Sequence, residues 1–82
     1  MFDQAVAKRV IEDVEREFQR AVEMHAPMNS DHEAYAVILE ELDEFKQEVW
    51  LKRSLRSTSK MRAELIQVAA MAVRAIHDLR LV

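Results

Sequence analysis

The chain has 82 residues, of which half are apolar and a third are charged, and it contains no cysteine. This length allows one small domain, and the lack of cysteine excludes disulfides, zinc–thiolate sites and iron–sulfur clusters. A domain of this size usually needs a metal or a partner subunit for stability. No apolar run reaches the length of a membrane span, and the N-terminus lacks the pattern of a signal peptide. We therefore expect a cytoplasmic protein with no membrane partner.

The composition predicts an all-α fold. Glycine is absent and Pro27 is the only proline, so tight hairpin turns and glycine-rich phosphate loops are excluded. The net charge of −3 hides an asymmetry, because residues 1–51 hold 13 acids and 5 bases whereas residues 52–82 hold 2 acids and 7 bases. A nucleic-acid polymer is not expected as a partner, since it would require a continuous basic face.

The first predicted element is an amphipathic helix over about residues 3–24. Its apolar positions recur at alternating steps of four and three, and they are Ala7, Ile11, Val14, Phe18, Ala21 and His25. Pro27 disfavours helix at the preceding residue and ends this element.

The second predicted helix covers about residues 31–52. Ser30 and Glu33 have the spacing of a capping box, in which each side chain accepts a hydrogen bond from a free amide of the first turn. Its predicted inward residues are Ala34, Tyr35, Ile38, Leu39, Leu42, Phe45, Val49 and Trp50.

The third predicted helix covers about residues 59–79, with Ser57, Thr58 or Ser59 as its N-cap. The short linker before it makes the second and third helices an antiparallel hairpin. We expect this hairpin and the N-terminal helix to assemble into an oligomeric helical bundle, a homodimer or homotetramer, because the apolar stripes are wide and the chain has no covalent staples.

Acidic residues recur along one side of the second predicted helix. Glu41, Glu44 and Glu48 stand at positions i, i+3 and i+7, and Glu40 lies beside them. Like charges at this spacing repel, unless one carboxylate is protonated or a cation lies among them. The pattern is therefore typical either of a solvated acidic face or of a cation site.

Glu64 and Gln67 form a second oxygen-bearing pair, at i and i+3 on the third predicted helix. In an antiparallel hairpin this pair faces the acidic residues of the second helix. Such oxygen ligands suit Mg²⁺, with Mn²⁺ as the other hard ion of this kind. Zinc lacks thiol ligands here, and no histidine has a glutamate three positions before it, as a ferritin-like di-iron site requires.

With this spacing the chain resembles the MazG-like, all-α nucleoside triphosphate pyrophosphohydrolases. Glu40-Glu41-x-x-Glu44 is followed after nineteen residues by Glu64-x-x-Gln67, which is similar to the EExxE…ExxD signature of that family. The segments HEAYAVILEELDEF and AELIQVAAMAVRAIHDL are similar to small bacterial and phage members. The resemblance covers about residues 30–79.

The resemblance implies Mg²⁺-dependent hydrolysis of a nucleoside triphosphate to its monophosphate and pyrophosphate. It implies that Glu41, Glu44 and Glu64 are metal ligands and that Glu40 belongs to the catalytic site. Gln67 stands where the family has aspartate, and its neutral amide oxygen can coordinate the ion weakly but cannot contribute charge or act as a base. The alternative function is therefore a helical oligomerisation or nucleotide-binding module that has lost activity through Gln67.

Further candidate substrate contacts lie near the linker. Lys52, Arg56 and Lys60 suit a triphosphate, although a solvated basic linker is the alternative. Trp50 lies near a helix end and suits stacking on a nucleobase, although aromatic residues at helical spacing are more often part of a core. His25 and His77 border apolar stripes and are interpreted as structural or surface residues.

Overall fold

The computed structural model describes residues 1–82, which form three α-helices and no strand. Helix α1 spans Gln4–Met24, α2 spans Asp31–Val49 and α3 spans Thr58–Asp78, and a short 3₁₀ turn, η1, covers Arg53–Leu55. None of the helices combines the length and the hydropathy needed to cross a bilayer. The predicted all-α architecture with three helices is confirmed.

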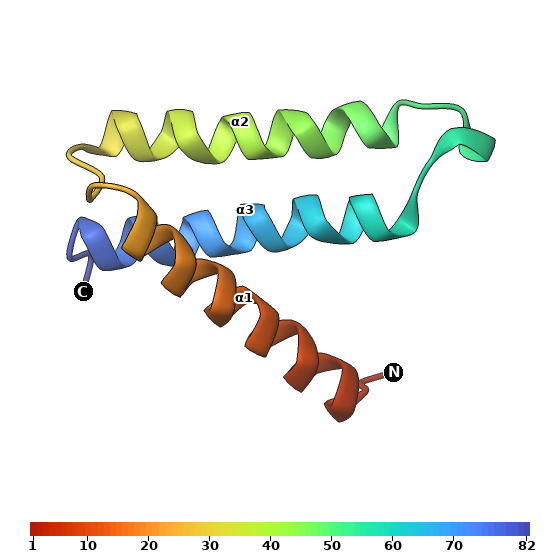
Figure 1. Ribbon diagram of the computed structural model, residues 1–82, viewed down its shortest axis with the longest axis horizontal. Coiled ribbons are helices and arrows are strands. Elements are labelled where there is room, and N and C mark those ends of the chain that lie inside the picture. The colour runs from red at the N-terminus through yellow and green to blue at the C-terminus, as the bar shows by residue number, and fades with distance from the viewer.

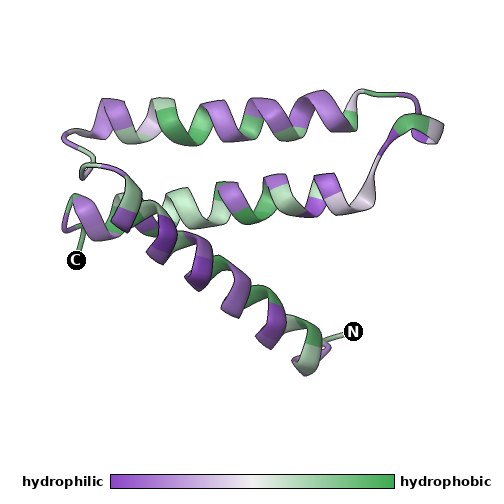
Figure 2. Cartoon of the chain, viewed as in Figure 1, coloured by the Kyte–Doolittle hydropathy of each residue, from purple (hydrophilic) through white to green (hydrophobic).

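Helices α2 and α3 form an antiparallel hairpin, and α1 crosses α3 obliquely, so that its N-terminal half diverges from the hairpin (Figure 1). Helix α1 packs closely on α3, whereas its backbone does not come close to that of α2. Hydrophilic and hydrophobic residues alternate in bands along each helix, as an amphipathic pattern requires (Figure 2).

Side-chain caps define the helix starts. Ser57 Oγ accepts from the Lys60 amide and so is the N-cap of α3. Ser30 Oγ accepts from the Glu33 amide, as predicted. The Glu33 carboxylate, however, accepts from the amide of Asn29 and not from that of Ser30.

Two helix ends differ from the pattern of the sequence. Helix α2 ends at Val49, three residues before the expected end, because the chain from Lys52 onward turns into η1. Helix α3 closes with Arg80 in the left-handed conformation, with a φ of 56°, so that the Leu81 amide bonds to the Ile76 carbonyl. Glycine usually occupies this position, and a side chain there costs about 1 kcal/mol.

The core is small and lies where the C-terminal end of α1 meets α2 and α3. Its buried apolar residues are mainly alanines and methionines, namely Ala21, Met28, Ala34, Ala70, Met71 and Ala75. The prediction that Tyr35, Leu39, Leu42 and Trp50 point inward is wrong for the single chain, in which all four side chains are exposed. The spacing of apolar residues shows that a helix has an apolar side. It does not show whether other residues of the same chain cover that side.

Candidate metal centre

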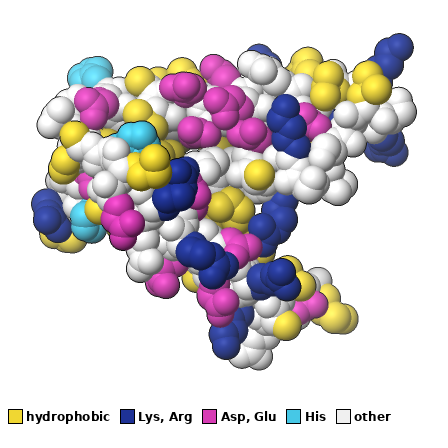
Figure 3. All heavy atoms as spheres, viewed as in Figure 1, with side chains coloured by type: hydrophobic (Ala, Val, Ile, Leu, Met, Phe, Trp, Pro, Cys, Tyr) yellow, Lys and Arg dark blue, Asp and Glu magenta, His cyan; other side chains and the backbone are white.

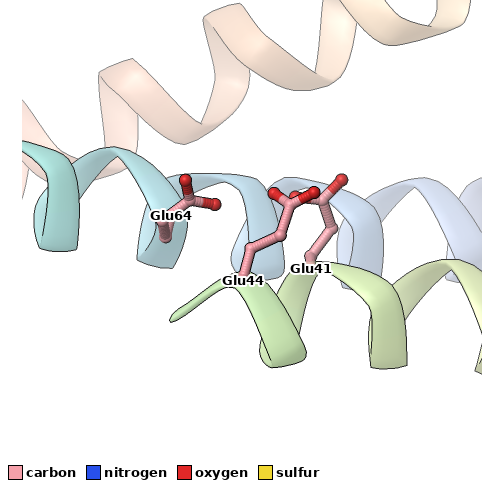
Figure 4. Close-up of side chains that lie close together, drawn as sticks. All are labelled: Glu41, Glu44 and Glu64. Carbon is pink, nitrogen blue, oxygen red and sulfur yellow. The ribbon is translucent and has the colours of Figure 1, made fainter. Parts of the chain in front are cut away.

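Three carboxylates from two helices meet on the hairpin. Glu41 and Glu44 lie one turn apart on α2, and Glu64 lies opposite them on α3 (Figure 4). One carboxylate oxygen from each residue lies within 4.8 Å of the others. Acidic side chains gather along α2 on this face of the molecule (Figure 3). The hairpin therefore brings together the three residues for which the resemblance implies metal binding.

The electrostatics of the three carboxylates are unfavourable without a cation. Partial burial raises the pKa of Glu41, and the charges of Glu44, Glu64 and Glu40 raise it further. Burial also raises the pKa of Glu64, as does its contact with Glu44, while the charge of Lys60 partly offsets both effects. None of Glu41, Glu44 and Glu64 forms an ion pair. A bound cation would relieve this repulsion.

The donor set fits a small hard cation. Mg²⁺ binds oxygen at about 2.0–2.1 Å in an octahedral arrangement, so two oxygens on opposite sides of the ion are separated by about 4.2 Å. The three carboxylate oxygens lie within 4.8 Å of one another, which is at most a fraction of an ångström more than this separation. Rotation of the flexible glutamate side chains can close such a gap. The remaining coordination positions would belong to water or to substrate oxygens.

The other two predicted members of the site lie at its margins. Glu40 is exposed and close enough to Glu41 for its charge to raise the pKa of that carboxyl. The Gln67 side chain faces Glu17 of α1. The Arg20 hydrogen bond is the main cause of a lowered pKa of Glu17, which burial opposes, and the hydrogen bond from Gln67 lowers it further.

Glu48 continues the acidic series but has a structural role. Its side chain is only 3% exposed, and Glu48 Oε1 accepts a 2.6 Å hydrogen bond from the amide of Ser57. Lys60 Nζ lies 3.8 Å from the other carboxylate oxygen. Glu48 therefore ties the end of α2 to the start of α3. The spacing of the acids does not indicate this role, because the role depends on where the linker between α2 and α3 brings the Ser57 amide.

A groove beside the carboxylates adds residues that the sequence reasoning missed. Its volume is about 370 Å³, and all three helices contribute to its lining, which comprises Glu17, Arg20, Ala21, His25, Val37, Glu41, Gln67, Met71 and Arg74. Arg20 pairs with Glu17, and buried Arg74 pairs with Asp78 and donates to the Ala26 carbonyl. Among the missed residues only Arg74 has a signal in the sequence, because its charge interrupts the alanine-rich apolar stretch of α3.

The predicted phosphate and base contacts lie at the hairpin turn. Arg56 Nε donates to the Leu51 carbonyl at 2.9 Å, and Lys52 is exposed. Lys60 is one turn from Glu64 and is close enough for its charge to act on that carboxyl. Trp50 is 75% exposed at the end of α2, where Lys46 Nζ lies 5.8 Å from its ring centre. None of these residues lines the groove.

The chain matches no protein-family model, no curated protein and no solved structure in the comparisons made. A function for this chain therefore has to be inferred from the arrangement of its own side chains.

Proposed function

We propose that this protein is a Mg²⁺-dependent nucleoside triphosphate pyrophosphohydrolase. The observation that supports the proposal is the meeting of Glu41, Glu44 and Glu64 oxygens within 4.8 Å, with no ion pair to any of the three carboxylates. The resemblance of the EExxE and ExxQ segments to the MazG-like signature supplies the reaction class. The adjoining groove of about 370 Å³ supplies space for a substrate.

In this proposal each acidic residue has a distinct role. Glu41, Glu44 and Glu64 would hold the ion, which would supply neutralisation of phosphate charge and orientation of water. Glu40 is exposed and is not needed as a ligand, so it accepts the proton of the attacking water. Water adds to the α-phosphorus, and the bond from that phosphorus to the oxygen bridging to the β-phosphorus breaks. The products are the monophosphate and pyrophosphate.

The substrate contacts in this proposal come from the hairpin turn. Lys60, one turn from Glu64, is the basic residue best placed for a phosphate oxygen, with Lys52 and Arg56 farther along the linker. Trp50 is exposed and offers a ring face to a base. Mn²⁺ would substitute for Mg²⁺, because both ions prefer oxygen ligands.

The direct test is pyrophosphate release from a panel of nucleoside triphosphates with Mg²⁺ and with Mn²⁺. The parent should turn over at least one nucleotide, and Glu41→Gln/Glu44→Gln should lose more than about tenfold in rate, since even indirect partners of metal ligands are worth about 10–100-fold. Asp43→Asn, an exposed acid on the same helix, is the matched control and should retain the rate. No turnover of any nucleotide by the parent would refute the enzyme proposal.

The alternative is an inactive relative that binds nucleotides or only self-associates, and one observation favours it. Gln67 faces Glu17 and brings no charge to the carboxylates. If the parent is active, Gln67→Asp should change its rate modestly in either direction. If the parent is inactive because a carboxylate is missing, the same substitution should strengthen Mg²⁺ binding and produce pyrophosphate release where the parent shows none. No gain in Mg²⁺ affinity would exclude Gln67 as the cause of inactivity.

A further inference from the structure

The turn between α2 and α3 combines exposed apolar and exposed basic side chains. Three large apolar residues lie within six positions of the chain, with exposures between 39% and 75%, and they are Trp50, Leu51 and Leu55. Three basic residues lie among and beside them and are also exposed, and they are Lys52, Arg53 and Arg56. Single exposed apolar residues are normal, but a contiguous group marks a binding surface. We call these six residues the turn surface.

No acidic residue offsets the positive charge of the turn surface. Residues 49–63 contain no aspartate or glutamate, and none of the three basic residues of the turn surface forms an ion pair. Arg56 Nε donates to the backbone carbonyl of Leu51, which leaves the charge of Arg56 uncompensated. Glu48, the nearest acid in the sequence, is buried and holds the start of α3. The turn surface therefore presents three uncompensated positive charges to solvent.

The turn surface lies at one extremity of the molecule. The turn is the far end of the hairpin along the longest axis, beyond the N-terminal half of α1 (Figure 1), and apolar and basic side chains gather at this end (Figure 3). The molecule extends 40 Å along this axis and 29 and 23 Å across it. Glu44 lies five residues before the end of α2, which is more than one helical turn. A flat partner at this end can therefore contact the turn surface without contacting the carboxylates.

Both kinds of side chain suit the surface of a bilayer that contains anionic lipids. An indole ring favours the level of the lipid headgroups, and leucine side chains favour the boundary with the acyl chains. Lysine and arginine are attracted to anionic lipids and keep their charged ends among the phosphates while their stems stay in apolar surroundings. The positive charge of the turn surface is thus complementary to such a bilayer, and its apolar side chains leave water there.

Other partners would use only part of this surface. A nucleic acid offers phosphates to the basic residues and bases to Trp50, but it leaves the aliphatic side chains of Leu51 and Leu55 without an apolar contact. A second copy of the chain in a two-fold contact would bring the same uncompensated positive charges together, and these charges repel. A bilayer with anionic lipids offers a favourable contact to every residue of the turn surface.

We propose that the turn surface binds the surface of a lipid bilayer that contains anionic lipids. Trp50, Leu51 and Leu55 enter the interface, and the three basic residues contact lipid phosphates. We expected no membrane partner because no apolar run reaches the length of a span, but contact with one leaflet requires no such run. The inference does not rest on the proposed function, and Lys60, the basic residue nearest to the carboxylates, is not part of the turn surface.

The fluorescence of Trp50 tests the proposal directly, because Trp50 is the only tryptophan of the chain. Vesicles of phosphatidylcholine, with or without phosphatidylserine, are titrated into the purified chain without Mg²⁺ or nucleotide, so that the result is independent of catalysis. Phosphatidylserine vesicles should shift the emission to shorter wavelength and bind at least about tenfold more tightly than phosphatidylcholine vesicles, since each basic residue near an anionic surface contributes about fivefold. No shift, or equal affinity for both vesicles, would overturn the proposal.

Two variants with the same net charge locate the contact. Arg53→Glu/Leu55→Ser alters a base and a leucine of the turn surface that are not candidate substrate contacts, and it should weaken binding to phosphatidylserine vesicles by at least about tenfold. Arg80→Glu/Leu81→Ser makes the same two changes at exposed positions beyond the other end of α3. This control should bind as the parent does. Equal losses in the two variants would show that the turn surface is not the contact and would overturn the proposal.

A further measurement uses the unchanged chain and so does not depend on the folding of a variant. Bromine atoms on lipid acyl chains quench an indole only at close range. Vesicles of phosphatidylserine and brominated phosphatidylcholine should therefore quench Trp50, whereas the same vesicles without bromine should not. Absence of this quenching would overturn the proposal. Binding of single-stranded RNA but not of vesicles would also overturn it and would assign the turn surface to a nucleic acid.

Discussion

Asp78 holds the loop between α1 and α2 against α3. Its side chain is only 4% exposed, and its Oδ2 lies 3.2 Å from Arg74 Nε and accepts a 3.0 Å hydrogen bond from the Met28 amide. The neighbouring His77 Nδ1 lies 2.8 Å from Asp78 Oδ1. Because Met28 is part of the small core, this carboxylate connects the core to the polar network at the end of α3.

Asp78 should make the protein sensitive to acid. Burial alone would raise the pKa of this carboxyl, but the hydrogen bonds from His77 and the Met28 amide and the charge of Arg74 together lower it below its ordinary value. A carboxylate with a lowered folded-state pKa stabilises the fold above about pH 4, and this contribution is lost as the pH falls through the folded-state pKa.

Asp78→Asn should lower the free energy of unfolding at neutral pH by about 1–3 kcal/mol, because it leaves Arg74 without its charged partner. Urea unfolding measured from neutral pH down to pH 3 checks both effects, and the variant should lose less stability on acidification than the parent. Asp43→Asn, at an exposed position, should follow the parent. Identical acid profiles for the parent and Asp78→Asn would contradict this role.

At the scale of the helices, the hairpin turn depends on one buried acid. The Glu48 carboxylate accepts a hydrogen bond from the Ser57 amide, just before α3 begins. The Ser57 hydroxyl in turn accepts a hydrogen bond from the Lys60 amide and so caps α3. The carboxylate thus fixes how α3 starts relative to the end of α2. That register also determines which residues of α3 face Glu41 and Glu44.

Glu48→Ala should destabilise the protein by about 1–3 kcal/mol, because it leaves a partly buried amide without an acceptor. Gln47→Ala, an exposed neighbour on the same helix, should cost less than about 0.5 kcal/mol. Thermal or urea unfolding of both variants measures the difference. If the two variants are equally stable, the Glu48 contact does not hold the turn.

Local chemistry made the helices predictable from the sequence. Ser30 and Ser57 cap the helices that follow them. An N-cap side chain bonds only to an amide in the first turn of its own helix, so nearby residues are enough to predict it. The short linker between α2 and α3 also predicted that the two helices are antiparallel neighbours. For the same reason Glu64 was expected near Glu41 and Glu44, as the structure shows.

Features that depend on long-range packing were not predictable. The exposure of Tyr35 and Leu42 follows from what α1 leaves uncovered, and periodicity carries no information about that. The partnership of Gln67 with Glu17 requires the crossing of α1 over α3. Glu48 is buried because the linker returns over it. The path of the linker cannot be read from the spacing of the acids, so the structural role of Glu48 was not predicted.

At the scale of the whole molecule, the two sides of the hairpin have different chemistry. One side presents acidic residues and a groove of about 370 Å³ to which α1 contributes, and the other presents exposed apolar side chains, among them Tyr35, Leu42 and Leu65. The candidate site therefore stays accessible on a chain with only eight buried residues.

The response of the melting temperature to Mg²⁺ tests most directly whether the carboxylates form a metal site. An ion that binds only the folded chain stabilises it by about 2.7 kcal/mol at a hundredfold excess over Kd, which corresponds to a rise of about 10 °C or more for a domain of this size. Glu41→Gln/Glu44→Gln should abolish the rise and leave the metal-free protein at least as stable as the parent, because it removes repulsion. Equal Mg²⁺ responses in parent and double variant would contradict the metal site and, with it, the proposed function.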